Sequence, residues 1–171
     1  MENMSGASPE ILTRLLDEHG AALVLYAQQW CESPEDVVQD AFLALVRQAD
    51  PPANAVGWLY RVVRNGAINA SRGSRRRSNR ETAAAGTAKP WFHVTLDDRL
   101  DAAEAARTMR QLPIHERETI VARLWGGLSF DEIAQLTGSS TSTVHRWYQA
   151  GLNSLRERLG VECPQKRNKT I

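Results

Sequence analysis

A short run of hydrogen-bonding side chains lies near the C-terminal end of the chain, and its residue types suit contacts with DNA. An arginine such as Arg146 can donate two hydrogen bonds to the edge of a guanine. Hydroxyl side chains can reach either bases or phosphates. The residues predicted to contact DNA here are Ser140, Thr141, Ser142, Thr143, His145 and Arg146. This set predicts a segment that reads bases in a major groove.

The surrounding sequence predicts two short helices joined by a tight turn. Ser129 followed by Glu132 forms a capping box, so a helix should begin there. Gly138 suits the positive φ with which short helices often end, and the hydroxyls after it offer N-caps for a second helix. That helix carries apolar residues at three- and four-residue steps, namely Val144, Tyr148, Leu152, Leu155 and Leu159. These signals favour a helix-turn-helix over the alternative, a plain helical hairpin in a bundle core.

A second group of candidates, between positions 54 and 77, combines aromatic, amide and basic side chains. A protein that opens duplex DNA must hold a base that has left the stack. This needs stacking surface or hydrogen bonds, beside cations that hold the phosphates. The candidates are Asn54, Trp58, Arg61, Arg64, Asn65, Asn69, Arg72, Arg75, Arg76 and Arg77. Trp58 suits a core position equally well. The alternative for the arginines at 75–77 is a solvated run without a binding role. It is disfavoured because no acidic residues are interleaved with the basic ones.

A helix predicted at 34–48 carries acidic residues away from its apolar side. Ser33 and Pro34 form a start signal, a capping hydroxyl followed by proline at the first helical position. The apolar side includes Val37, Val38, Ala41, Leu45 and Val46. The other side and its edge offer four candidates for contact with a basic partner, namely Asp36, Gln39, Asp40 and Phe42. The alternative is an acidic face that is simply solvated.

The whole pattern predicts an all-α protein made of two small helical domains joined by a flexible linker. The first domain covers 8–77, with helices at 9–19, 21–31, 34–48 and 55–70, and the second covers 97–160. The linker is expected at 78–96, where apolar periodicity stops, and a disordered tail at 161–171. The formal net charge is only +1, but acidic residues predominate up to Asp50 and only basic ones occur from 61 to 80. This segregation predicts one surface for nucleic acid and another for a different partner.

Several other classes of protein are disfavoured. The 4 histidines lie in separate segments without a Cys or carboxylate at metal-ligand spacing, and no glycine-rich phosphate loop occurs. We therefore expect no enzyme activity, no metal and no cofactor. Cys31 and Cys163 are far apart, which indicates reduced thiols. No stretch is long and apolar enough to cross a bilayer, so a cytoplasmic protein without membrane insertion is expected.

With both domains laid out, most of the chain resembles a bacterial RNA polymerase sigma factor of the extracytoplasmic-function (ECF) group. Residues 34–42 (PEDVVQDAF) are similar to the family's polymerase-binding helix. Residues 57–65 (GWLYRVVRN), with Arg72 and the arginines at 75–77, resemble the part of sigma region 2 that melts and reads the minus-ten element. Residues 112–159 resemble the helix-turn-helix that reads the minus-thirty-five element, a domain of the winged-helix-like, sigma region 4 type.

The resemblance implies an alternative sigma factor that binds core RNA polymerase and directs it to specific promoters. Its partners would be core polymerase and both double- and single-stranded promoter DNA. Members of the group are often held by an anti-sigma factor, and the sequence identifies none. The chain departs from many members in the later recognition helix, where Trp147, Gln149 and Ala150 stand in place of basic residues.

The alternative function is a free-standing helix-turn-helix regulator that binds operators as a dimer. It accounts for the second domain but not for the acidic helix at 34–48. A pure protein adaptor would leave the basic run unused.

Overall fold

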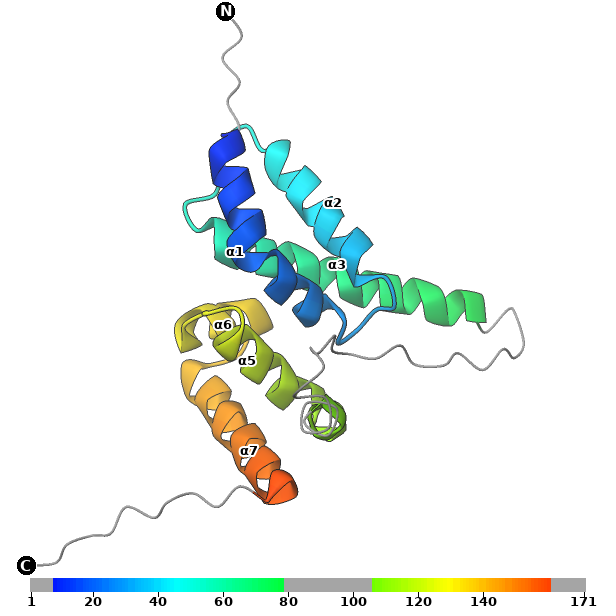
Figure 1. The fold of residues 1–171 in the computed structure, drawn as a ribbon, viewed down its shortest axis with the longest axis vertical. Helices are drawn as coiled ribbons and strands as arrows, with labels where there is room; N and C mark the ends of the chain where they lie inside the picture. The colour runs from blue at the N-terminus through cyan, green and yellow to red at the C-terminus, as the bar shows by residue number, and fades with distance from the viewer. Residues whose placement is uncertain (1–7, 79–105, 161–171) are drawn as a thin grey trace, which may run out of the picture.

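The part of the chain that the structure describes is built from helices (Figure 1). It is a computed structural model, and it describes residues 8–78 and 106–160. No strand occurs among these residues, and the predicted all-α class is confirmed. The predicted linker, apart from Ser78, and the predicted tail at 161–171 lie outside the described residues.

Three helices form the first domain, α1 (Pro9–Ala27), α2 (Pro34–Val46) and α3 (Ala55–Ser78). Each of them packs against the other two. The predicted apolar stripes meet at the centre, where Leu23, Leu45 and Leu59 are fully buried. Because burial of leucine side chains stabilises by roughly 1.5–3 kcal/mol each, this core holds the three helices together.

α1 is one continuous helix, so the prediction of two helices at 9–19 and 21–31 is wrong. Ser8 caps it by accepting a hydrogen bond from the Ile11 N–H at 3.4 Å. Gly20, taken from the sequence as a break, is buried inside the helix. A helical glycine costs about 1 kcal/mol relative to alanine. Burial of Leu15 before it and Leu23 after it outweighs that cost, and the helix continues.

α2 begins at Pro34 as predicted, but two details differ from expectation. Ser33 makes no side-chain capping hydrogen bond, so its predicted capping role is wrong. Val46 is 48% exposed and does not belong to the buried side. It follows the buried Leu45 by one residue, which rotates it by about 100° around the helix axis. Val38, Ala41 and Leu45 form the buried side of α2.

The second domain consists of helical residues 106–111 followed by α5 (Ile114–Leu124), α6 (Phe130–Thr137) and α7 (Thr141–Leu159). α5 packs against both α6 and α7. Ile120, Ile133 and Val144 are fully buried where these three helices meet. Gly151 of α7 lies so close to α5 that an added Cβ would stand 2.7 Å from Cδ1 of Ile120. Glycine at this position therefore allows the two helices to approach closely.

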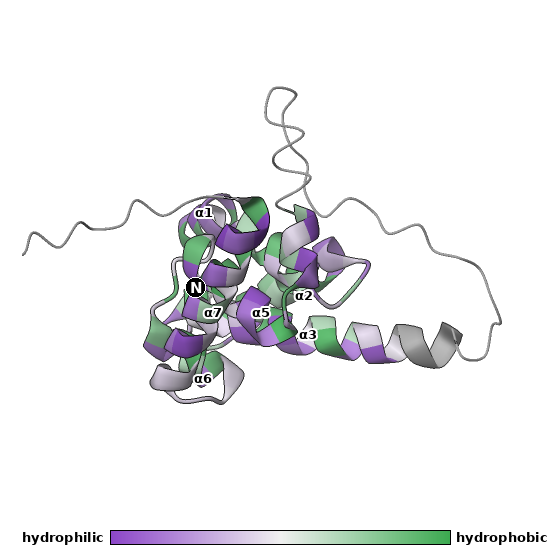
Figure 2. Ribbon diagram, turned by 90° about the horizontal axis from the view of Figure 1, so that it is seen from below, coloured by the Kyte–Doolittle hydropathy of each residue, from purple (hydrophilic) through white to green (hydrophobic). Residues whose placement is uncertain are grey.

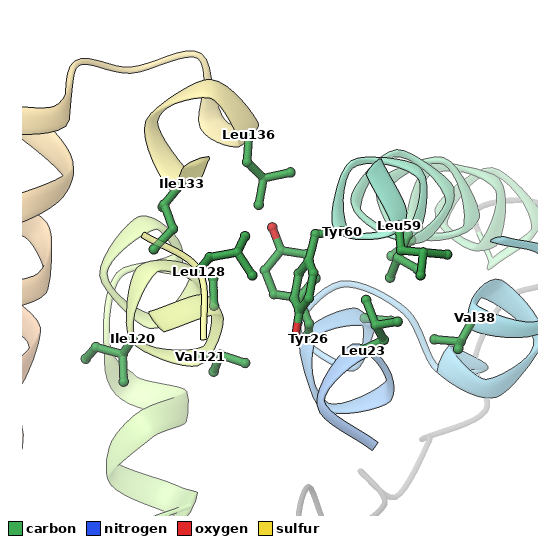
Figure 3. Close-up of a cluster of buried hydrophobic side chains, with 14 of the residues drawn as sticks. Leu23, Tyr26, Val38, Leu59, Tyr60, Ile120, Val121, Leu128, Ile133 and Leu136 are labelled. Atoms are coloured by element: carbon green, nitrogen blue, oxygen red, sulfur yellow. The ribbon is translucent and has the colours of Figure 1, made fainter. Parts of the chain in front are cut away.

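The two domains pack against each other and share one hydrophobic core (Figure 3). α1 contacts α5, and α3 contacts α6. Tyr26 of α1 and Tyr60 of α3 lie between the side chains of the two domains, with ring centroids 4.9 Å apart in an edge-to-face arrangement. Both tyrosines are fully buried, so their positions depend on the presence of both domains.

Among the helices of residues 8–78 and 106–160, α3 is the longest, and it extends beyond the rest of the bundle (Figures 1 and 2). Its last buried residue up to position 73 is Ala67. The predicted helix at 55–70 therefore continues, and the arginines at 75–77 lie within α3 instead of following it. The side chains at 74–78 lie outside the described part of the structure.

Candidate nucleic-acid interface

The turn between α6 and α7 is held by local hydrogen bonds. Ser129 and Glu132 form the predicted capping box: the Glu132 N–H donates to Ser129 Oγ at 3.2 Å, and the Ser129 N–H donates to Glu132 Oε2 at 2.7 Å. Gly138 ends α6 with φ of 68°, the left-handed conformation predicted for it. Ser140 then caps α7 by accepting the Thr143 N–H at 3.2 Å. The helix-turn-helix prediction is confirmed, and the start of α7 has a defined position.

The N-terminal part of α7 presents an exposed face on the side opposite Val144. Thr141, Ser142, His145 and Arg146 are all exposed, as predicted. The guanidinium of Arg146 has no ion-pair partner among the described residues. It is therefore available to donate to a base edge or to a phosphate.

Other hydroxyls of the predicted set already have partners within the protein. The Ser140 hydroxyl caps the helix and lies 2.8 Å from the Thr143 hydroxyl and 3.0 Å from the Ser142 hydroxyl. The Thr141 hydroxyl donates to Oδ1 of Asp131 at 2.7 Å. These groups support the turn, and the free hydrogen-bonding capacity of α7 is concentrated at Arg146 and its neighbours.

Gln149 belongs to the same exposed face, and the sequence reasoning did not include it among the contacts. It is exposed and follows His145 by four residues. A glutamine can make two hydrogen bonds to an adenine. The helical step of four, already used for the apolar stripe, would have identified it.

The second predicted group, on α3, divides into two parts. Four polar side chains are exposed at helical spacing and form one stripe along α3: Arg61, Asn65, Asn69 and Arg72. Trp58 is half-buried and packs against the core, so part of its side chain contributes to the stability of the first domain. The stripe retains the amide and basic groups that base capture requires.

Arg64, which was predicted to contact DNA, lies at the contact between the domains in this structure. Its Nε lies 2.6 Å from Oε1 of Glu118 on α5, and its Nη2 lies 3.5 Å from Oε2 of the same carboxylate. The Tyr26 hydroxyl donates to Oε1 of Glu118 at 2.5 Å. Burial, and then the charge of Glu118, raise the pKa of Tyr26 well above its ordinary value. The hydroxyl therefore stays protonated and acts as a donor.

Glu118 itself was missed in the sequence, although a signal for it exists. It stands three residues before Val121 and four before Ala122, on the apolar side of α5. A carboxylate at such a position must find a charged or hydrogen-bonding partner. The sequence pattern shows that a partner is needed, but not which residue provides it.

Asn54, also predicted to contact DNA, has two partners within the protein. Its Oδ1 accepts the Gly57 N–H at 2.9 Å, which caps the start of α3. Its Nδ2 donates to Oε1 of Glu132 in the second domain at 2.7 Å. Asn54 and Arg64 thus both bond to carboxylates of the other domain, while the exposed stripe of α3 does not.

α2 presents the predicted acidic face, together with apolar residues that were not predicted. Asp36, Gln39 and Asp40 are exposed, and Phe42 is half-buried against the core. Leu43 follows Asp40 by three residues and is 44% exposed. With Val46, it adds an apolar part to this face, which suits a partner that buries area as well as pairing charges.

Two absences concern the described residues only. Within 8–78 and 106–160, no group of three or more His, Cys, Asp or Glu side chains is placed to hold a metal ion. No helix in the same ranges is long and apolar enough to span a membrane.

Two protein-family models match the chain, and together they cover both domains. The model for Sigma-70 region 2 matches residues 15–77, and the model for Sigma-70, region 4 matches residues 102–155. The first match spans most of α1, all of α2 and nearly all of α3. The second includes the whole turn between α6 and α7.

Known proteins of similar sequence match over most of the chain. The RNA polymerase sigma factor CarQ of Myxococcus xanthus is 30% identical over 133 residues, covering 74% of this chain and 74% of that protein. The ECF RNA polymerase sigma factor SigL of Mycobacterium tuberculosis is 29% identical over 175 residues, covering 94% of this chain and 99% of that protein.

Two solved structures have the same fold. The sigma factor RpoE in complex with the anti-sigma factor NepR from Bartonella quintana has a TM-score of 0.73 and 20% identity, with 91% of this chain and 100% of that chain covered. CnrH in complex with the cytosolic domain of CnrY has a TM-score of 0.60 and 24% identity, with 92% of each chain covered.

Proposed function

The chain belongs to the extracytoplasmic-function group of RNA polymerase sigma factors, which are alternative factors for promoter-directed transcription, and we propose a separate role for each of three of its helices. α7 reads the minus-thirty-five element, α3 melts and reads the minus-ten element, and α2 binds core RNA polymerase. The chain performs no catalysis of its own, because RNA synthesis belongs to the polymerase.

The observation that carries this proposal is the exposed face of α7. Ser142, His145, Arg146 and Gln149 project from a helix whose start is held by a capping serine and a left-handed glycine. A helix presented in this way inserts its N-terminal residues into a major groove. Arg146 supports recognition of guanine, and Gln149 supports recognition of adenine.

The exposed stripe of α3 supports the minus-ten role. Asn65 and Asn69 offer hydrogen bonds to the edge of an unstacked base, and Arg61 and Arg72 flank them with positive charge for the phosphates. The continuation of α3 through 75–77 adds three more arginines on the same element.

The exposed face of α2 supports the polymerase role. Its carboxylates would form charge-assisted hydrogen bonds with a basic helix, while Leu43 and Val46 would be buried on docking. Because RpoE has been solved in complex with an anti-sigma factor, an anti-sigma protein is a further partner class that we expect for this chain.

Run-off transcription tests the proposal. The chain is added to core polymerase on a library of promoter fragments, and the transcribed templates are sequenced. We expect enrichment of two short elements separated by a constant spacing. Transcripts no more numerous than with core polymerase alone would reject the proposal. Tight duplex binding by a dimer without polymerase would instead support the free-standing regulator.

A further inference from the structure

The hydroxyl of Thr141 has a fixed direction of hydrogen bonding, unlike the hydroxyls beside it at the start of α7. It donates to Oδ1 of Asp131 at 2.7 Å. A carboxylate only accepts hydrogen bonds, and a threonine hydroxyl has a single proton to give. The hydroxyls of Ser142 and Thr143 both contact that of Ser140, and either oxygen of each pair can be the donor. Thr141 therefore retains lone pairs that can accept, but no free proton.

Thr141 belongs to the exposed face that α7 presents. It is the first residue of α7 and stands four residues before His145, which stands four before Gln149. All three are exposed, so they form one row along the helix. Two residues of α6 contact this row: Asp131 bonds to Thr141, and the Phe130 ring meets the His145 ring edge to face, with centroids 5.1 Å apart. The first turn of α6 thus orients side chains of this exposed face.

The carboxylate of Asp131 makes a phosphate contact at Thr141 unfavourable. Asp131 is exposed and has no ion-pair partner in the described parts of the chain, 8–78 and 106–160. Its negative charge repels a DNA phosphate that approaches the neighbouring hydroxyl. A phosphate oxygen is also an acceptor, so it has no proton to offer to the lone pairs of Thr141. The hydroxyl is therefore suited to a base edge.

The bases differ in what they offer to an acceptor in the major groove. Adenine presents its N6 amino group there and cytosine its N4 amino group, and both groups donate. Guanine presents N7 and O6, and thymine presents O4 and a methyl group, so neither offers a donor. A side chain that can only accept distinguishes the first two bases from the last two. A hydroxyl with a free proton does not, because it can donate as well as accept.

We propose that Thr141 is a specificity-determining residue for the minus-thirty-five element, where it selects adenine or cytosine at one position by accepting from the exocyclic amino group. Asp131 is the positioning residue, because it holds the proton of the Thr141 hydroxyl. The inference rests on the proposed role of α7 in reading this element. It adds one base preference to those expected from Arg146 and Gln149. The charge of Asp131 also weakens binding to DNA of every sequence, so this residue increases discrimination while it lowers affinity.

The test measures binding of the holoenzyme to duplexes that carry each of the four bases at every position of the upstream element recovered by run-off transcription. Thr141→Val removes the hydroxyl and nearly keeps the shape of the side chain, whereas Thr141→Ser keeps the hydroxyl. We expect Thr141→Val to reduce the preference for adenine or cytosine at one position by about 2- to 10-fold, the effect of one hydrogen bond. Thr141→Ser should retain the preference.

Asp131→Ala tests the positioning role. It frees the proton of the Thr141 hydroxyl, so guanine or thymine should become better tolerated at the same position, and binding to every sequence should become tighter. Glu157→Ala is the matched control, since it removes an exposed carboxylate near the other end of α7. The control should leave the base preference unchanged. Circular dichroism shows whether each variant keeps the helical content of the wild type.

A change in the DNA identifies the group that Thr141 contacts, and it needs no variant of Asp131. Purine in place of adenine, or 2-pyrimidinone in place of cytosine, removes only the exocyclic amino group. The wild type should lose about 2- to 10-fold in affinity through this change. Thr141→Val should lose less on the same two duplexes, because it has no hydroxyl to accept from the amino group. Any weakening of the base pair is common to both proteins and cancels in the comparison.

Two results would overturn the inference. One is that Thr141→Val weakens binding equally on every sequence, which would make Thr141 a phosphate contact. The other is an unchanged base preference in Thr141→Val, with an equal effect of the base analogue on this variant and on the wild type. Either result would be obtained with a wild-type holoenzyme that binds the element. Failure of the proposed function is distinguishable, because it would appear as absent run-off transcription by the wild type.

Discussion

Gly126 stands against the ring of Tyr60 across the contact between the domains: a Cβ at position 126 would lie 2.6 Å from the Tyr60 hydroxyl oxygen. The same Cβ would lie 2.5 Å from the carbonyl oxygen of Ala122. No side chain fits there without movement of the backbone or of the tyrosine. Gly126, two residues after the end of α5, thus determines how closely the second domain approaches α3.

Gly126→Ala should destabilise the protein by about 1–3 kcal/mol, the usual cost of overpacking a filled site. Gly73→Ala on α3 is the matched control, since a Cβ there meets nothing within 4 Å. The control should be neutral or stabilising by about 0.5–1 kcal/mol, because alanine is the better helix former. Urea unfolding measures both. Equal stability of the two variants would show that the protein can accommodate a methyl group beside Tyr60 without losing free energy of unfolding.

Arg146→Ala should weaken binding to the preferred upstream element by about 1–3 kcal/mol and relax its sequence preference. Gln149→Ala should relax the preference at a neighbouring base pair. Arg14→Ala, an exposed arginine on α1, is the control for charge alone. Binding is measured with the holoenzyme on duplex variants of the element. If Arg146→Ala weakens binding equally on every sequence, the residue contacts a phosphate and reads no base.

Gln39→Ala combined with Asp40→Ala should abolish capture by core polymerase while the melting temperature stays near that of the wild type. Both side chains are exposed and support little of the core. Loss of such docking contacts typically costs about 2–5 kcal/mol of binding. A pull-down with core polymerase and a thermal melt provide the two readouts, with Asp17→Ala on α1 as the control.

Undiminished capture by the double variant would remove α2 from the interface. An absence of capture even with the wild type would favour the free-standing regulator.

The capping box of α6 predicts a pH-dependent loss of stability. The Ser129 backbone N–H, then its hydroxyl and Asn54, lower the pKa of Glu132 from 4.5. A carboxyl whose pKa is lowered by folding stabilises the protein above its unfolded pKa, and this stabilisation is lost as pH falls through the folded value. Glu132→Gln should therefore be less stable than the wild type at neutral pH. The difference between them should shrink below pH 4.5.

Ser129→Ala, which removes the helix cap itself, should cost about 0.5–2 kcal/mol at neutral pH. Urea unfolding across the acid range measures both variants. A constant difference between Glu132→Gln and the wild type at all pH values would contradict the role given to the carboxylate.

The features that the sequence predicted well are those that depend on neighbouring residues. The capping box at Ser129, the left-handed Gly138 and the N-cap at Ser140 each involve groups only a few residues apart, so their types and spacing carry the information. The exposed face of α7 follows from the same helical period. The proximity of α1 and α5 could not be predicted from the spacing of neighbouring residues. Tyr26 and Glu118 are 92 positions apart in sequence, and only the folded chain brings them together.

Errors arose where packing overrides a local preference. Gly20 favours a break in an isolated peptide, but burial on both sides keeps α1 intact. The carboxylate partner of Arg64 was likewise not predicted, because α5 brings Glu118 to it from 54 positions away in the sequence. The DNA contacts that the sequence suggested for Arg64 and Asn54 stay predictions, and in the structure both side chains bond to carboxylates of the second domain.

The absence of buried residues at 68–73 of α3 has a consequence for circular dichroism. From position 68 to 78 the helix runs for about 16 Å at 1.5 Å per residue, and no residue is buried between 68 and 73. A helical segment with no buried residue, such as 68–73, is marginal in water. The sequence also places four arginines close together here, Arg72 and those at 75–77, and like charges at such spacing disfavour a helix. A polyanion that neutralises them removes this repulsion. DNA binding should therefore increase the helical signal of the protein, and high salt should reproduce part of that increase without any DNA.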